Sequence, residues 1–278
     1  MHDLIIKKGM KSILKYLIIV LFGIAFLMPF IWLLSSSLKD AGETFRIPPT
    51  IFPRKLNWNN YVKAVTLIPY LLYAKNSLII SIISIIGGLI TCSMVAFSIT
   101  KIDWRFKKIL FALIIATILI PYQVTMIPVY IIFNKLHFID TYLPLVIGYF
   151  CAPSIYVFLM RQFFLTIPDQ ILDSAKIDGA NSFIIWYKLM LPLLKGIFAA
   201  VGVFIFLGTW SDFLGPLIYI NSIEKRTLSL GLTMFVSEHS VEWGALMAAS
   251  ALFAIPMVIL FFFAQKQLNG SIKLTGFK

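Results

Sequence analysis

The stretch that decides the fold of this chain reads Asp173-Ser174-Ala175-Lys176-Ile177-Asp178-Gly179-Ala180. It is polar, it places a glycine between two helical patterns, and long apolar runs lie on both sides of it. A protein that is mostly apolar needs such a segment where another protein must grip it from the water. The stretch therefore predicts a membrane protein that offers one polar segment to a partner.

The composition independently places most of the chain in a bilayer. Of the 278 residues 60% are hydrophobic and only 13% are charged, and the mean hydropathy is +0.92. Soluble domains carry roughly 25% charged residues. No soluble domain of ordinary size fits between the apolar runs.

The net charge of +12 does not indicate a nucleic-acid partner. The 24 Lys and Arg residues lie mainly at the ends of apolar runs, where they set membrane topology. No basic run is interleaved with aromatic residues in the way that nucleic-acid binding requires. We therefore expect no nucleic acid among the partners.

Six apolar segments are long enough to cross a bilayer, which takes about 20 helical residues. They cover residues 13–34, 72–100, 109–133, 141–160, 196–220 and 244–264. The predicted fold is an all-α polytopic membrane protein with six transmembrane helices. Residues 1–12 form an N-terminal tail, and residues 13–278 form one membrane domain with an outer loop at 39–70 and a polar segment at 161–195.

The distribution of basic residues predicts the orientation. With the N-terminus inside, most Lys and Arg residues fall on the inner side. Both termini and the polar segment 161–195 are then cytoplasmic, and the first apolar run is favoured as an uncleaved anchor. The loop 39–70 is either a membrane-interface loop, which is the simpler interpretation, or a docking surface for an external partner.

Local sequence signals give the polar segment its expected shape. Pro168 suits the first position of a helix, and Gly179 can end that helix in the left-handed conformation. Asn181 can cap the next helix, which we expect to run to a stop at Pro192. Two interpretations remain open: both helices lie on the lipid surface, or they form a rigid knob for a cytoplasmic partner.

Asp212 is the one acid well inside an apolar run. An ionised carboxylate at that depth usually faces a bundle interior or a wet cavity. Trp210 and Phe213 flank it, so the group either lines a sugar path or makes a structural contact between helices. Asn76 opens the second span, where helix capping is the simpler interpretation.

The remaining reactive side chains suggest no chemistry. Cys92 and Cys151 both lie in apolar runs, where small buried thiols are expected. Glu238, His239 and Glu242 are too weak a set to predict a metal site.

The polar segment resembles the signature of the permease subunits of bacterial ABC importers. That signature is Glu-Ala-Ala, three residues, Gly, nine residues, Ile, one residue, Leu-Pro. This chain has Asp173-Ser174-Ala175, Gly179, Leu189 and Leu191-Pro192 at that spacing. The fuller Ile177-Asp178-Gly179-Ala180 looks like the carbohydrate branch of the family.

Further matches extend in order over most of the chain. They are Asn76-Ser77-Leu78, Leu119-Ile120-Pro121, Ile127-Pro128, Arg161-Gln162-Phe163-Phe164, Ile167-Pro168, Trp210-Ser211-Asp212-Phe213 and Pro216. The whole is similar to the second permease subunit of maltose-type importers. Three positions depart from the pattern: Asp173 replaces Glu, Ser174 replaces the first Ala, and Ser211 replaces the more usual Asn.

The resemblance implies a role for each matching group. The residues that would couple to an ATPase are Asp173, Ser174, Ala175, Asp178, Gly179, Ala180, Leu191 and Pro192. The residues that would lie on the translocation path are Asn76, Trp210, Ser211, Asp212 and Phe213. The implied role is mechanical, with no catalytic residue and no metal.

The resemblance also implies the partners. They are a homologous permease, two cytoplasmic ATPase subunits, an extracellular sugar-binding protein, a carbohydrate substrate and the lipid of a bacterial cell membrane. No cofactor is expected in this chain, because ATP and Mg would be bound by the ATPase. The sequence indeed lacks a Gly-x-x-x-x-Gly-Lys-Ser/Thr phosphate loop.

Two other functions compete with an importer subunit. A membrane-embedded enzyme would need convergent acids, His or Ser within the spans, and only Asp212 stands there. An ion-coupled carrier acting alone usually shows more spans and several intramembrane charges.

Overall fold

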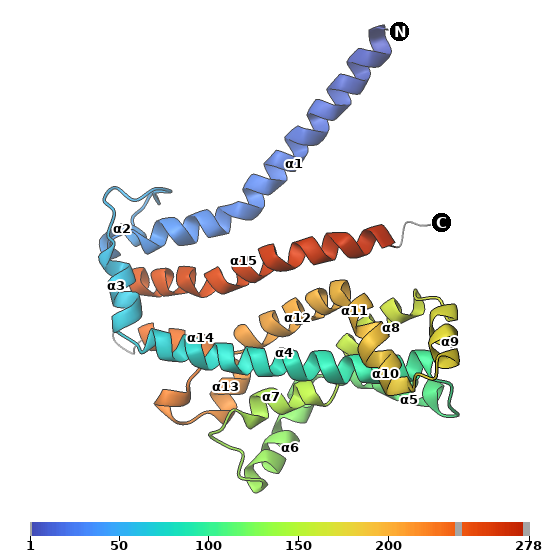
Figure 1. The fold of residues 1–278 in the computed structure, drawn as a ribbon. Helices are drawn as coiled ribbons and strands as arrows, with labels where there is room; N and C mark the ends of the chain where they lie inside the picture. Colours follow the sequence, from blue (N-terminus) through green and yellow to red (C-terminus); the bar gives the residue numbers. More distant parts are fainter. Residues whose placement is uncertain (1, 237–240, 275–278) are drawn as a thin grey trace. The chain divides into compact units, whose positions relative to one another are not determined.

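The computed structural model describes the backbone of residues 2–236 and 241–274 and the side chains of residues 14–236 and 241–265 (Figure 1). In these residues the chain is almost entirely helical, and the only β-pairing is a single bridge between Val236 and Val241. The chain divides into two compact units. The first comprises residues 1–68 and 234–254, and the second comprises residues 69–233 and 255–278.

The first unit joins the end of a long helix to the loop that follows it. It contains α1 (His2–Ser37), α2 (Ala41–Thr44), α3 (Asn59–Thr66) and the start of α15 (Trp243–Leu274). The buried amide of Asn60 donates to the backbone carbonyls of Ser37 (2.9 Å) and Lys39 (2.8 Å). The first bond satisfies a carbonyl that the end of α1 leaves without a helical partner, and the second holds the residue that lies just beyond this helix. The loop 39–70 therefore contains two helices, α2 and α3, and α3 is fastened to the end of α1.

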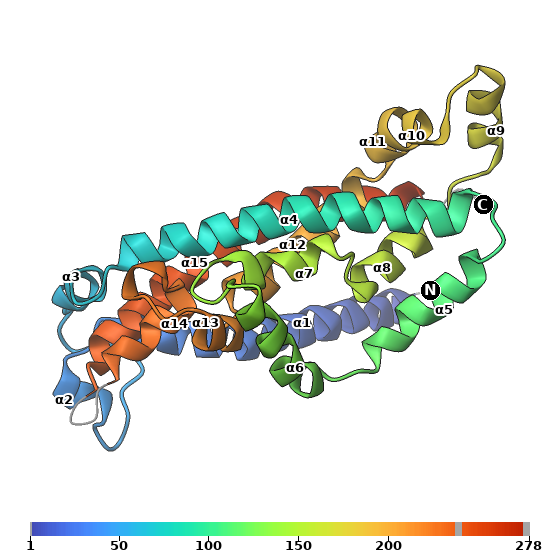
Figure 2. The same cartoon turned by 90° about the horizontal axis from the view of Figure 1, so that it is seen from below.

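The second unit contains the other elements. They are α4 (Tyr70–Lys101), α5 (Lys107–Ile118), α6 (Tyr122–Lys135), α7 (Leu143–Phe150), α8 (Ser154–Leu165), α9 (Gln170–Ile177), α10 (Ser182–Ile184), the π-helix η1 (Ile185–Met190), α11 (Leu191–Leu193), α12 (Lys195–Trp210), α13 (Leu214–Tyr219), η2 (Ile223–Lys225), α14 (Leu228–Gly231), η3 (Leu232–Phe235) and the rest of α15. The last two residues of η3 belong to the first unit. Figure 2 shows α7, α8 and α12 lying along α4, which runs the length of this unit.

Small residues let the other helices approach α4 closely. Its buried face carries serines, glycines, Cys92 and Ala96, and small residues are the usual contact of helices packed within membranes. A methyl group added at Gly87 would lie 2.5 Å from the Phe150 ring, and one at Gly88 would lie 2.6 Å from Ile205. The glycines therefore set the spacing of α4 from α7 and α12.

The membrane-crossing helices are less regular than the sequence predicts. In the described part of the chain, four helices are long and apolar enough to cross a bilayer, or up to six if each of two bent pairs forms one span. The predicted span 109–133 bends by 100° between α5 and α6. Pro121 precedes α6 in an extended conformation and cannot donate the helical hydrogen bond. The predicted span 109–133 is therefore a bent pair of helices, which length and composition still allow to form one span.

Two more predicted spans are interrupted. The span 141–160 consists of α7 and α8, separated by residues 151–153, where Ala152 has φ +53°. The span 196–220 consists of α12 and α13, separated by residues 211–213. Such non-helical backbone is tolerated at membrane depth only where protein buries it or where it lines a wet cavity.

The structure corrects the interpretation of Asn76 as a helix cap. Helix α4 begins at Tyr70, so Asn76 lies in its second turn. Its buried amide donates to the carbonyls of Glu224 (2.8 Å) and Arg226 (2.9 Å), and the neighbouring Ser77 hydroxyl accepts from the Leu228 amide. Asn76 and Ser77 therefore fasten the 224–228 segment to α4.

Asp140 organises the connection between α6 and α7. Its carboxylate accepts hydrogen bonds from the amides of Asn221 (3.0 Å) and Ser222 (2.8 Å), and from the Ser222 hydroxyl. The ammonium of Lys225 lies 2.9 Å from the same carboxylate. The Ser222 hydrogen bonds, followed by that of Lys225, hold the pKa of Asp140 well below its ordinary value.

Replacing Asp140 with alanine should destabilise the chain. Hydrogen bonds to a charged group contribute about 1.5–3 kcal/mol, so we expect a loss of about 2 kcal/mol, measured as a lower melting temperature in detergent. Alanine at Asp103, whose side chain is 97% exposed, is the control and should change stability little.

The same network predicts a dependence on pH. The pKa of Asp140 is depressed in the folded chain, so its stabilisation is complete above the unfolded value of about 3.9. It is lost as the pH falls below that value towards the folded pKa. Asp140→Asn should remove this part of the acid sensitivity. An unchanged acid transition in that variant would contradict the role of Asp140.

Candidate functional site

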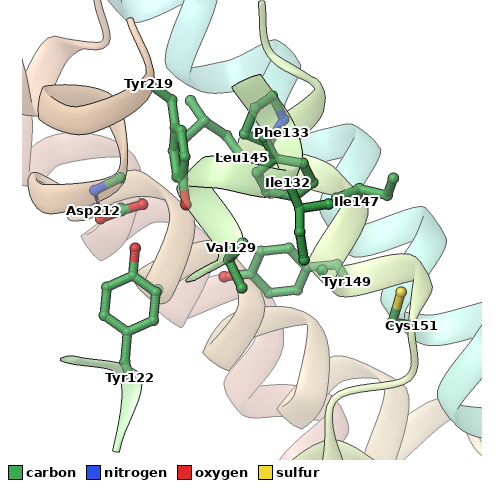
Figure 3. Close-up of a pocket in the computed structure, with 14 residues that line it drawn as sticks. Tyr122, Val129, Ile132, Phe133, Leu145, Ile147, Tyr149, Cys151, Asp212 and Tyr219 are labelled. Atoms are coloured by element: carbon green, nitrogen blue, oxygen red, sulfur yellow. Dashed lines mark hydrogen bonds between the residues drawn. The ribbon is translucent and has the colours of Figure 1, made fainter. Parts of the chain in front are cut away.

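A partly open cavity of about 600 Å³ lies between α6, α7, α12 and α13 (Figure 3). Its walls are mostly apolar or aromatic, with one carboxylate. They are formed by Tyr122, Val129, Ile132, Phe133, Pro144, Leu145, Ile147, Gly148, Tyr149, Cys151, Gly208, Asp212, Gly215 and Tyr219. Cavities that bind small molecules have this character and measure about 300–1,000 Å³.

The interrupted helices meet at this cavity. Tyr122 directly follows the break at Pro121, Cys151 lies in the break between α7 and α8, and Asp212 lies in the break between α12 and α13. Three segments that depart from the helix thus contribute to the walls of one space.

Asp212 is held by the helix that follows it. One carboxylate oxygen accepts from the amide of Gly215 (3.0 Å), which satisfies an amide that the start of α13 would leave unpaired. A methyl group at Gly215 would collide with the other carboxylate oxygen. Glycine at 215 therefore makes room for Asp212, and that second oxygen remains available to a ligand.

Three tyrosines surround the carboxylate with aromatic surface and hydroxyl groups. Figure 3 shows the hydroxyl ends of Tyr122 and Tyr219 pointing towards Asp212, with the Tyr149 ring along the same wall. Tyr219 also stacks on Tyr130, with the ring centroids 6.1 Å apart. The site can accept and donate hydrogen bonds and offers flat apolar faces.

The site carries no arrangement typical of catalysis or metal binding. No group of three or more His, Cys, Asp or Glu side chains that could hold a metal ion occurs among the described residues. Glu242 instead pairs with Lys63 at 3.0 Å, and Glu238 and His239 lie outside the described residues. Cys92 is buried as expected, but the same expectation was wrong for Cys151, which is exposed in the cavity wall.

Of the predicted path residues, only Asp212 lines the cavity. Trp210 is buried and stacks on Phe206. The Ser211 hydroxyl donates a hydrogen bond to the Leu207 carbonyl. The side chain of Phe213 is 38% exposed and does not line the cavity. Asn76 forms the tether described above. A path role for these four residues has no cavity contact to support it.

The tyrosines were missed by the sequence analysis. Tyr122 follows the Leu119-Ile120-Pro121 motif. Pro121 lies inside a predicted span, so the sequence did contain a signal for a helix break next to Tyr122. Tyr149 and Tyr219 belong to ordinary apolar runs, and nothing local distinguishes them. Their convergence on Asp212 depends on how α6, α7 and α13 pack.

The polar segment has the local structure that its sequence predicts. Gly179 adopts φ +79°, and the amides of Gly179 and Ala180 bond to the carbonyls of Lys176 and Ala175. This is the Schellman ending of a helix. The Asn181 side chain accepts from the Ile184 amide (2.8 Å) and caps the next helix.

Two details of this segment differ from expectation. Helix α9 begins at Gln170, two residues after Pro168. Pro192 lies inside α11 and does not end it; the chain turns at Leu194, where the two helical parts meet at 82°. The turns before Pro192 are wound as the π-helix η1, a form that often occurs at functional positions.

One face of the segment is packed and the other is free. Leu172, Ile185 and Trp186 are buried in a core shared with α4 and α8, and Ala175 and Ala180 pack against that core. Asp169, which lies outside the predicted membrane spans, accepts a hydrogen bond from the Lys101 ammonium at 2.6 Å from nitrogen to oxygen. That hydrogen bond lowers the pKa of Asp169. The anchored segment carries exposed apolar side chains.

The exposed face contains most of the predicted coupling residues. Asp173 pairs loosely with Lys176 (3.3 Å), Ser174 bonds to the Ile171 carbonyl, and Asp178 ends α9. The most exposed apolar side chains are Ile177 (86%), Phe183 (61%) and Tyr187 (58%). This face fits a partner protein or a lipid surface, so the geometry alone leaves both interpretations open.

Comparison with known proteins identifies similar chains. Residues 84–274 match the family model of the binding-protein-dependent transport system inner membrane component. The chain is 30% identical to the arabinooligosaccharides transport system permease protein AraQ of Bacillus subtilis (strain 168), over 94% of each chain. It is 32% identical to the probable starch degradation products transport system permease protein AmyC of Thermoanaerobacterium thermosulfurigenes, over 94% of this chain and 95% of that one.

A solved structure shares the fold. It is the crystal structure of a bacterial ABC transporter involved in the import of the acidic polysaccharide alginate, which matches with a TM-score of 0.81 over 93% of this chain and 96% of that chain. The sequence identity is 20%, so this likeness bears on the fold alone.

The turn at Gly179 predicts a specific order of substitutions. No atom lies within 4 Å of a methyl group placed there, so a side chain costs conformational energy and causes no clash. Alanine should lower the free energy of unfolding by about 1 kcal/mol, and asparagine by less, because it tolerates the left-handed region. The expected change in melting temperature is about 2–4 °C.

Gly23→Ala is the matched control, because Gly23 lies in α1 with open space around it. This variant should keep or raise the melting temperature, since alanine is the better helix former. Equal stability of Gly179→Ala, Gly179→Asn and the unmodified chain would show that the turn does not constrain the segment.

Proposed function

Because this chain belongs to the binding-protein-dependent transport system inner membrane component family, we propose that it forms part of the membrane path of an ATP-driven importer for a sugar or oligosaccharide. The observation that carries this proposal is the cavity at the three helix breaks. It combines a carboxylate, tyrosine hydroxyls and aromatic faces, and it lies between segments that are apolar enough to cross a bilayer.

A carbohydrate suits the chemistry of this cavity. The free oxygen of Asp212 can accept a hydrogen bond from a sugar hydroxyl, and the hydroxyls of Tyr122 and Tyr219 can accept or donate one. The faces of the tyrosine rings can pack against the C–H faces of a sugar ring. The relatives named for arabinooligosaccharides and for starch degradation products point to the same substrate class.

The cavity is only partly enclosed by this chain. A homologous permease packed against it would complete the path and close it against lipid. An extracellular sugar-binding protein would deliver the substrate to the outer side. The chain itself is a transport subunit and not an enzyme.

The polar segment 161–195 is the proposed contact with the ATPase. Its exposed face carries Asp173, Ser174, Asp178 and Gly179. Its buried face, against which Ala175 and Ala180 also pack, is fixed to α4 and α8. A rigid knob of this kind can transmit closure of two ATPase subunits to the spans. ATP and Mg would be held by those subunits, with no cofactor in this chain.

This function sets the orientation in a bacterial cell membrane. Docking of an ATPase places segment 161–195 in the cytoplasm, and the two termini then lie on the same side. Two earlier alternatives fit this function less well. If segment 161–195 lay on the lipid surface, the ATPase would have no contact with this chain. An ion-coupled carrier acting alone would not need a segment that contacts an ATPase.

Cys151 gives a direct test of the path, because its thiol lines the cavity while Cys92 is buried. In the reconstituted complex, a membrane-impermeant methanethiosulfonate reagent should modify Cys151. Uptake assays with arabinotriose and maltotriose would first establish which one is imported. The imported oligosaccharide should then slow the modification by occupying the cavity.

The control is Cys151→Ser, which keeps Cys92 and should remove the modification. A sugar that is not imported should give no protection. If the imported oligosaccharide left the rate of Cys151 modification unchanged, the substrate would pass elsewhere and this cavity would not be its site.

A further inference from the structure

A second and smaller pocket, of about 210 Å³, lies between α4, α5 and α8. It is separate from the cavity at the helix breaks and shares no residue with it. Its basic side chains are Lys107, Lys108 and Arg161, and its apolar walls include Ile99, Phe111 and Leu165. Three cations around one small space indicate an anionic ligand.

Arg161 is the best-fixed of these cations. Its guanidinium lies 4.0 Å from the centre of the Phe111 ring, an attractive arrangement that also sets its orientation. Its Nε is buried and has no hydrogen-bond partner in the described part of the chain. A buried donor left unpaired costs free energy, and an anionic oxygen in the pocket would satisfy it.

The lysines are only partly neutralised. Lys107 pairs at 3.1 Å with Asp103, whose side chain is 97% exposed to solvent. Among the described residues no carboxylate forms an ion pair with Lys108 or with Arg161. The pocket therefore keeps an excess of positive charge.

The position of the pocket identifies the source of the anion. It lies where the membrane-crossing helix α4 ends at Lys101, which is the level of lipid headgroups. Apolar side chains next to it are exposed on α5 and α8, namely Ile109 (59%), Leu113 (60%) and Leu165 (52%). Such an apolar surface can contact the acyl chains of a lipid, whereas inorganic phosphate has no apolar part that could contact it.

We propose that this pocket binds the phosphate-bearing headgroup of an anionic membrane lipid. Arg161 presents its fork of N–H donors to the phosphate oxygens, and Lys108 contributes a second charge from the rim. Basic pockets between membrane helices are known to select anionic lipids. The inference requires only that the chain is embedded in a membrane and does not depend on the proposed transport function.

The test measures lipid binding to the purified full-length chain by native mass spectrometry. The chain is prepared in a zwitterionic detergent with added phosphatidylglycerol or phosphatidylcholine. The expected result is preferential retention of phosphatidylglycerol. Arg161→Gln and Lys108→Gln should each weaken that binding about fivefold, with no change for phosphatidylcholine.

Lys135→Gln is the matched control, because it removes one exposed positive charge from the end of α6, outside the pocket. It should leave phosphatidylglycerol binding unchanged. Lys108 is exposed, so its variant keeps the test valid if Arg161→Gln does not fold. Equal losses in Lys108→Gln and Lys135→Gln would overturn the site in favour of general surface charge.

Inorganic phosphate distinguishes the lipid from a free anion. At concentrations matched to the lipid it should not displace phosphatidylglycerol, because it lacks the acyl chains that contact α5 and α8. Displacement by inorganic phosphate as effective as by the lipid would overturn the lipid assignment. Binding of phosphatidylcholine as tight as that of phosphatidylglycerol would also overturn the proposal.

Discussion

Backbone groups within a bilayer must find hydrogen-bond partners, because lipid offers none. Three apolar segments of this chain nevertheless depart from the helix, at Pro121, at residues 151–153 and at residues 211–213. All three departures border the same cavity, which holds Asp212 and three tyrosines. The requirement to satisfy the broken backbone thus explains why the polar site lies there and why it must be wet or covered by a partner.

The cavity and the polar segment share one packed core. Leu172 and Trp186 of the segment are buried with α4 and α8, and Tyr149 of the cavity wall packs against the same core. Close-packed interiors resist deformation and transmit displacement. A force applied to residues 173–180 would therefore reach the cavity wall through side chains in direct contact, and in the proposed importer this path would couple ATP hydrolysis to substrate movement.

The sequence predicted features that depend on local chemistry. Gly179 and Asn181 behave as expected because helix ends are decided by residues a few positions apart. Asp212 faces a cavity, as expected for a carboxylate in an apolar run, because exposing the charge to lipid would cost free energy. The helix breaks were missed because hydropathy measures how apolar a run is and does not report whether its backbone is helical throughout. Asn76 was misread because its partners lie about 150 residues away.

The central claim is that this chain acts in an assembly and binds its ATPase through the polar segment. Affinity purification from the native membrane, followed by mass spectrometry, tests it most directly. The account predicts recovery of a second permease and an ATPase, with the ATPase lost when residues 173–192 are scrambled in a chain that still inserts. Recovery of the chain alone, or retention of the ATPase by the scrambled variant, would contradict it.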